Sequence, residues 1–204
     1  MDIQLSDHFT YKRLIRFVLP SIVMMMFSSI YGIVDGLFVS NFVGKSAFAA
    51  LNLIFPFLQI LGTLGFMIGT GGTALVAKTL GEGNTDKANE IFTLLLVVLI
   101  VGGGLVSVVA IIYLRPIALF LGATEALIDD CITYGRIILS FNIAFMLQCA
   151  FQSFMVTAQK PQLGLYFTIG AGVMNMVMDA LLVGYFKLGV VGAASATVLS
   201  QCVG

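Results

Sequence analysis

Residues 91–114 decide the fold of this chain, and they read IFTLLLVVLIVGGGLVSVVAIIYL. The stretch is uncharged, and it does not alternate between apolar and polar residues as a strand of a membrane barrel would. A helix needs about 20 apolar residues to cross the hydrocarbon core of a bilayer. The sequence therefore predicts a transmembrane helix here, because helices and closed barrels are the only forms that satisfy the backbone in lipid.

The composition of the whole chain points to the same solvent. Its 204 residues are 59% hydrophobic and 10% charged, with a mean hydropathy of +1.06. An ordinary globular domain carries about 25% charged residues. This chain has too little charge to cover a surface in water, so we expect the lipid bilayer to surround it. The formal net charge of +0 argues against a nucleic-acid partner, because phosphate binding requires an excess of Lys and Arg.

Similar apolar stretches follow one another along the chain. The predicted spans cover residues 17–43, 46–77, 91–114, 131–159, 163–186 and 188–204. They predict an all-α polytopic membrane protein, a bundle of six transmembrane helices over residues 1–204 that ends within its sixth helix. Gly65 and Gly69 have the small-xxx-small spacing of closely packed membrane helices. We expect these glycines to serve packing, with a gliding surface for conformational change as the alternative.

The basic residues give the expected orientation in the membrane. The inner side would hold Lys12, Arg13, Arg16, Lys78, Lys87 and Lys160. The outer side would hold Lys45, Arg115, Arg136 and Lys187. Because cytoplasmic loops carry an excess of Lys and Arg, this bias predicts a multi-pass protein of the cell (plasma or inner) membrane with a cytoplasmic N-terminus.

Two carboxylates, Asp35 and Asp179, interrupt apolar spans. A charge within a membrane costs about 2.5 kcal/mol or more, so it usually faces a cavity, a partner or an ion pathway. For Asp35 an alternative is a capping role near the membrane interface. At 1.5 Å per residue, both carboxylates lie at a similar depth of about 24 to 27 Å along outward-running helices. Thr197 would lie about 12 Å in from the outer side, and Asn175 one turn deeper than Asp179 on the same face.

These four side chains could therefore meet in one pocket. Two carboxylates, an amide and a hydroxyl form an oxygen cage that suits a desolvated cation, and a carboxylate also accepts a proton. We expect a cation-binding or coupling site for a proton or sodium at this cluster, with no other metal and no cofactor. No Ser/His/Asp or Cys/His constellation or metal-spaced cluster suggests an enzyme.

Four segments carry a resemblance to the MATE (multidrug and toxic compound extrusion) family. VDGLFV over residues 34–39 resembles the family's VDTxFVG segment, with Gly36 in place of the common threonine. LGEGNTDKA over residues 80–88 resembles its LGxGNxxxA loop. NMVMD over residues 175–179 resembles its NxxxD motif, and GVVGAASATVLSQ over residues 189–201 resembles its GxxGAAxATxxSQ segment. The matches span nearly the whole chain, in the family's order.

The resemblance implies a secondary active transporter, not an enzyme, that exports amphipathic, commonly cationic drugs in exchange for protons or sodium. It assigns the coupling-ion pocket to Asp35, Asn175, Asp179 and Thr197. Family members have twelve helices in two six-helix lobes. This chain resembles the N-terminal lobe, so the C-terminal lobe would be its missing partner, and we expect the sequence to be a fragment or a truncated product.

Two other functions stay open. A flippase of lipid-linked saccharides shares the broader superfold, but such proteins tend to hold anionic phosphates with basic cavity residues. The interiors of the spans here lack Lys and Arg, which favours the drug exporter. A non-transporting membrane subunit that binds a partner would be favoured if the chain really ends at residue 204.

Overall fold

The described part of the chain is built from helices. A computed structural model describes residues 11–158 and 160–204, and within these ranges it contains no β-strand. Residues 1–10 and 159, which the predicted lobe and its fourth span include, lie outside the described residues. The all-α class that the apolar stretches predicted is confirmed.

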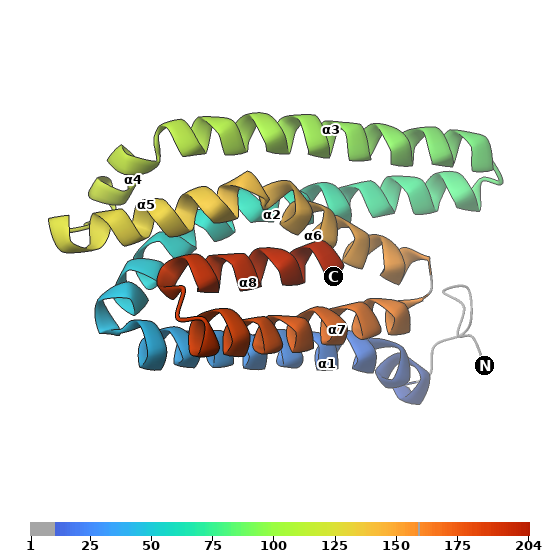
Figure 1. Cartoon of the computed structure of the whole chain (residues 1–204). Coiled ribbons are helices and arrows are strands. Elements are labelled where there is room, and N and C mark those ends of the chain that lie inside the picture. Colours follow the sequence, from blue (N-terminus) through green and yellow to red (C-terminus); the bar gives the residue numbers. More distant parts are fainter. Residues whose placement is uncertain (1–10, 159) are drawn as a thin grey trace.

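The long helices run side by side between the two ends of a bundle (Figure 1). In chain order they are α1 (Tyr11–Phe38), the π-helical η1 (Val39–Val43), α2 (Lys45–Gly81), α3 (Thr85–Ile112), α4 (Leu114–Phe120), α5 (Glu125–Ser140), α6 (Asn142–Thr157), α7 (Pro161–Asp179), the π-helical η2 (Ala180–Tyr185) and α8 (Gly189–Val203). The start of α1, the turn between α2 and α3 and the link from α6 to α7 share one end (Figure 1). The short α4 and the links after η1 and η2 lie at the opposite end.

Several of these helices are suited to cross a membrane. Four stretches are long and apolar enough: Ile22–Val43, Lys45–Gly81, Thr85–Ile112 and Gln162–Tyr185. Helices α5 and α6 make a fifth crossing if they are taken together. The apolar α8 has 15 residues, which corresponds to about 22 Å of helix. The chain is therefore a polytopic membrane protein.

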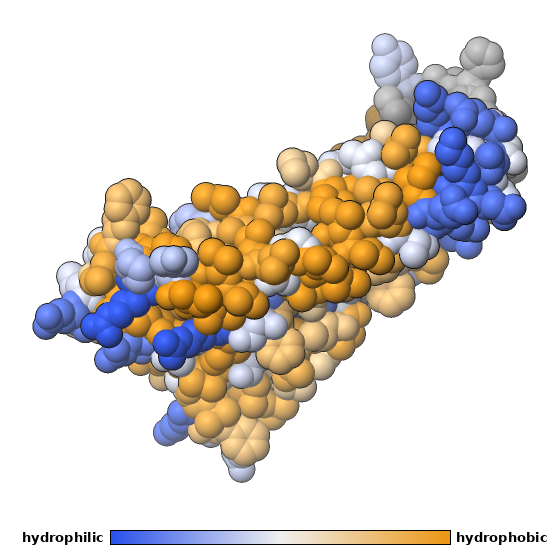
Figure 2. All heavy atoms as spheres, turned by 90° about the horizontal axis from the view of Figure 1, so that it is seen from above, coloured by the Kyte–Doolittle hydropathy of each residue, from blue (hydrophilic) through white to orange (hydrophobic). Residues whose placement is uncertain are grey.

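Apolar side chains also cover the outside of the bundle. Figure 2 shows hydrophobic residues over the middle of one face and hydrophilic residues gathered toward its two ends. On α3, Leu94, Leu105 and Ile112 are 62%, 64% and 67% exposed. An exposed apolar surface of this extent is the pattern of a protein whose solvent is lipid across the middle and water at the ends.

Glycines let α2 and α6 approach each other closely. A Cβ atom added at Gly65 would lie 2.5 Å from the backbone Cα and O atoms of Met146, and one at Gly69 would lie 2.8 Å from Cα of Ala150. Carbon atoms normally stay about 3.5 to 4.0 Å apart, so neither position has room for a side chain. The packing role predicted from the spacing of these two glycines is confirmed.

The fourth predicted span is a bent pair of helices. The helix α5 begins at Glu125, before the predicted start at residue 131, and it bends by 54° into α6. The bend is at Phe141, and Asn142, only 1% exposed, donates from Nδ2 to Oγ of Ser107 on α3 at 3.1 Å. A buried amide needs such a partner, so this hydrogen bond holds the bend against α3.

Candidate functional site

Two carboxylates enter the site from neighbouring helices. Asp35 lies near the end of α1, and Asp179 is the last residue of α7. The helix α1 packs along α7, and the two helices end on the same side of the bundle (Figure 1). The two carboxyl groups, whose equal depth was expected from counting residues, therefore lie beside each other.

Both carboxylate-bearing helices change their winding just beyond the carboxylates. In η1 the N–H of Gly44 donates to the carbonyl of Val39 at 3.1 Å, and in η2 the N–H of Phe186 donates to Leu181 at 2.8 Å. A spacing of five residues belongs to a π-helix, which is rare and is common at functional sites. The two π-helical segments also pack against each other. The helical winding is therefore irregular next to both carboxylates, at the end of α1 and at the end of α7.

The site holds oxygen atoms that lack hydrogen-bond donors. Asp179 is 0% exposed and Asn175 is 2% exposed. No donor among the described residues reaches Oδ1 or Oδ2 of Asp179, Oδ1 of Asp35 or Oδ1 of Asn175. Nearly all buried polar atoms in proteins have a partner, and leaving one without a partner costs free energy. A proton or a small cation between these oxygens would supply what the protein does not.

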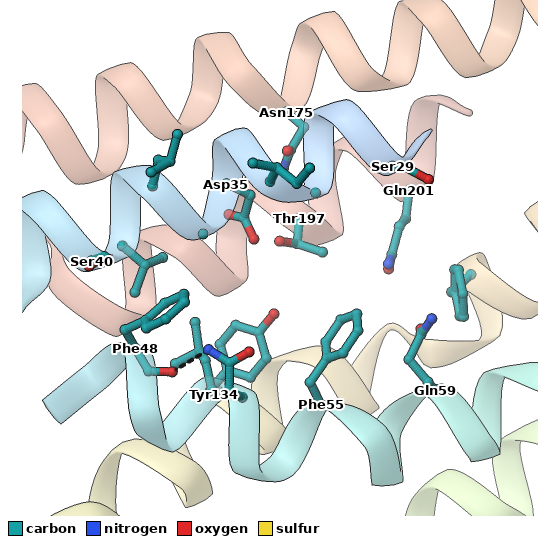
Figure 3. Close-up of a pocket in the computed structure, with 18 of the residues that line it drawn as sticks. Ser29, Asp35, Ser40, Phe48, Phe55, Gln59, Tyr134, Asn175, Thr197 and Gln201 are labelled. Carbon is teal, nitrogen blue, oxygen red and sulfur yellow. Dashed lines mark hydrogen bonds between the residues drawn. The ribbon is translucent and has the colours of Figure 1, made fainter. Parts of the chain in front are cut away.

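A hydroxyl pair completes the rim of the site. Thr197 donates from Oγ1 to the carbonyl of Ala193 at 3.0 Å. The hydroxyl of Tyr134 points toward Thr197 and Asp35 (Figure 3).

All four residues that the sequence singled out thus lie at one place. Asp35, Asn175 and Thr197 line a common cavity, and the buried Asp179 lies beside Asp35. Their role in holding a cation stays a prediction. Tyr134 was missed, because a tyrosine near the start of a predicted span is ordinarily read as an interfacial anchor. Its 3% exposure shows instead that the bent α5 carries it inward.

The cavity is large enough for an organic ligand. It has a volume of about 920 Å³, within the range of about 300 to 1,000 Å³ typical of small-molecule sites. Its walls come from α1, η1, α2, α5, α6, α7 and α8. Aromatic side chains in these walls are Phe48, Phe55, Tyr134 and Phe145. Figure 3 shows Phe48 and Phe55 projecting from α2 toward the side that holds Asp35 and Thr197.

The charge of the cavity is of one sign. Asp35 is the charged side chain among the lining residues that the structure describes, with Asp179 directly behind it, and no Lys or Arg is among them. The remaining polar lining consists of amides and hydroxyls. An acidic, aromatic chamber can attract an organic cation, since the faces of aromatic rings and carboxylates both favour positive charge.

Comparison with known proteins agrees with this architecture. The sequence profile of the MatE family matches residues 20–181. The multidrug export protein MepA of Staphylococcus aureus (strain MRSA252) is 28% identical over 194 residues, which are 94% of this chain and 42% of that protein. MepA of Staphylococcus haemolyticus (strain JCSC1435) is 23% identical over 193 residues. The chain therefore spans less than half the length of the curated relatives it matches.

Solved structures show the same fold. A crystal structure of MATE in the bent conformation superposes with a TM-score of 0.85 at 22% identity, over 93% of this chain and 42% of that chain. An outward-facing multidrug resistance MATE family transporter of the MOP superfamily gives a TM-score of 0.83 at 22% identity, over the same shares of the two chains. The described helices are thus the N-terminal lobe of a MATE fold.

Proposed function

The chain belongs to the MatE family, and we propose on that premise that it forms the N-terminal half of an exporter of amphipathic organic cations. Export would be coupled to the entry of protons or sodium ions, which makes the protein a secondary active transporter and not an enzyme. The observation that carries this proposal is the pair of carboxyl groups without donors, beside an aromatic cavity of about 920 Å³. The names of the multidrug export relatives support it.

Exchange follows from competition for negative charge. Two unit charges about 4 Å apart repel by about 4 kcal/mol at an effective dielectric constant near 20. A proton or sodium ion bound between Asp35 and Asp179 would remove most of this repulsion. It would also remove the attraction that Asp35 offers to an organic cation in the cavity. Binding of the small ion would then lower affinity for the drug, as a coupling between two ligands requires.

Transport also requires a second body. Alternating access works by moving one helical bundle against another around a central site. We propose that a C-terminal lobe supplies that bundle, since the chain matches 42% of the length of its export relatives. We also propose a cell membrane location with a cytoplasmic N-terminus, from the excess of Lys and Arg at that end of the helices.

The rival function has less support. A flippase of lipid-linked saccharides must hold an anionic phosphate, for which Arg and Lys are the usual partners. The described cavity lining contains neither. A cavity with an acidic end favours cations and repels phosphates. A non-transporting partner subunit gains no support from the cavity, because binding a protein partner does not require one.

A binding experiment tests the cation site of the proposal, because Asp35 and the aromatic residues of the described cavity lining belong to this chain. Tetraphenylphosphonium binding would be measured by equilibrium dialysis on the purified chain, with sodium or protons as competitors. We expect Asp35→Asn to weaken binding more than tenfold, whereas the control Asp129→Asn, on the exposed face of α5, leaves it unchanged. Equal binding by wild type and Asp35→Asn would refute the assignment.

A further inference from the structure

The cavity has a second polar region besides the carboxylates. Four glutamines line it, and they come from three helices: Gln59 from α2, Gln148 and Gln152 from α6, and Gln201 from α8. We call these four residues the glutamine cluster. Amides are costly at membrane depth unless they are hydrogen-bonded, so four of them around one chamber need a reason beyond packing.

The glutamine cluster lies deeper in the bundle than the carboxylates. Gln201 follows Thr197 by one helical turn on the same face of α8, which places it about 6 Å further in. Gln59 follows Phe55 by one turn on α2. Figure 3 shows Gln59 and Gln201 pointing toward each other's side of the chamber, with Phe55 between them and Tyr134. The chamber therefore has a carboxylate end, an aromatic middle and an amide end.

The members of the glutamine cluster differ in their hydrogen-bond partners. Gln152 donates from Nε2 to Oγ1 of Thr168 at 3.2 Å, and Thr168 donates to the carbonyl of Gly164 at 2.9 Å. Gln201 differs, because its Oε1 atom is buried and no donor among the described residues reaches it. A carbonyl oxygen in this position is an acceptor that a ligand's N–H or O–H group, a water molecule or a donor outside the described residues can satisfy.

We propose that the glutamine cluster is a second recognition subsite, in which Gln201 accepts a hydrogen bond from an amine or hydroxyl group of the substrate. This inference rests on the proposed export of organic cations and adds a chemical requirement to it. The preferred substrate is a flat aromatic cation whose N–H or O–H donor lies at the end of the molecule away from its positive centre. Its charge faces Asp35, its rings contact Phe55, and its donor reaches Gln201.

Two cations that differ in hydrogen-bond donors test the subsite. Ethidium carries two aromatic amine groups, whereas tetraphenylphosphonium has no N–H or O–H group. Both dissociation constants would be measured on the purified full chain by equilibrium dialysis. Loss of one neutral hydrogen bond changes an affinity by about threefold to tenfold. We therefore expect Gln201→Leu to weaken ethidium binding by about that factor and to leave tetraphenylphosphonium within about twofold.

A matched control and a second variant keep the test decisive. Gln162→Leu makes the same replacement at an exposed position near the start of α7, away from the cavity, and should change neither affinity. Tetraphenylphosphonium binding reports that each variant is folded. If Gln201→Leu binds neither cation, Gln59→Leu on the opposite wall decides by the same criterion.

The outcomes also separate this inference from the proposed function. In a variant that still binds tetraphenylphosphonium, equal changes for the two cations, or no change for either, would overturn the glutamine subsite. Asp35→Asn should weaken both cations together, because both carry a positive charge. If Asp35→Asn has no effect while Gln201→Leu acts on ethidium alone, the carboxylate assignment fails and the glutamine subsite stands.

Discussion

The close approach of α2 and α6 can be tested by adding a single methyl group. In Gly65→Ala the new Cβ atom would lie 2.5 Å from the Met146 Cα and O atoms and 2.8 Å from its carbonyl carbon. These contacts are about 1 Å shorter than normal carbon contacts. Because the obstructing atoms are backbone, rotation of a side chain cannot relieve them, and α6 must move by about 1 Å.

The expected cost follows from that displacement. Overpacking in a well-packed interior costs about 1 to 3 kcal/mol, which corresponds to a fall of about 2 to 12 °C in Tm for a chain of this size. The neighbours of Met146 on α6, Phe145 and Cys149, line the cavity. Moving α6 should therefore also weaken binding of tetraphenylphosphonium.

Gly71 offers a matched control on the same helix. A Cβ atom added there would meet nothing within 4 Å, and alanine is favoured over glycine in a helix by about 0.5 to 1 kcal/mol. We expect Gly71→Ala to keep or raise the apparent Tm in detergent, measured by fluorescence, while Gly65→Ala lowers it. Equal Tm values for the two variants would refute the argument that glycines set the distance between α2 and α6.

Three further experiments test the carboxylate pair, the bend between α5 and α6, and the cavity. Asp179→Asn should retain tetraphenylphosphonium binding, because Asp35 keeps its charge, and should lose competition by sodium in equilibrium dialysis; loss of drug binding would contradict this. Asn142→Leu leaves Ser107 without its buried partner and should lower the free energy of unfolding by about 1 to 3 kcal/mol. In thermal unfolding, the added change Ser107→Ala should restore part of the lost stability. No restoration would count against the hydrogen bond between the two residues. Maleimide should label Cys149, which lines the cavity, more slowly when ethidium is bound. It should not label the fully buried Cys131. Mass spectrometry on a Cys202→Ser background measures the labelling of both cysteines.

The equal depth of Asp35 and Asp179 in the membrane could be predicted from the sequence, because each residue of a helix adds a fixed rise along the helix axis. Each carboxylate lies in an apolar run, so its distance from the start of the run translates directly into height in the membrane. The packing of Gly65 was predictable for the same reason, since spacing alone defines a helix face. Depth and helix face are both properties of one helix at a time.

The bend between α5 and α6 was beyond that reasoning. It is stabilised by a hydrogen bond from Asn142 to Ser107, two residues that are 35 positions apart on different helices. Nothing in the local sequence identifies the pair. The bend directs Tyr134 inward, so the sequence could not place Tyr134 in the cavity without predicting the bend. The glutamine cluster escaped notice in the same way, because it is assembled from three helices and no single helix displays it.

The two carboxylates have unequal access, and this shapes the proposed exchange. Asp35 lines the cavity, whereas Asp179 is 0% exposed and lies behind it. A bulky organic cation can therefore meet Asp35 but cannot enter the space between the two carboxyl groups. A proton or a sodium ion is small enough to lie there. The small ion and the drug then act on the same negative charge from different sides, so they exclude each other electrostatically without sharing a volume.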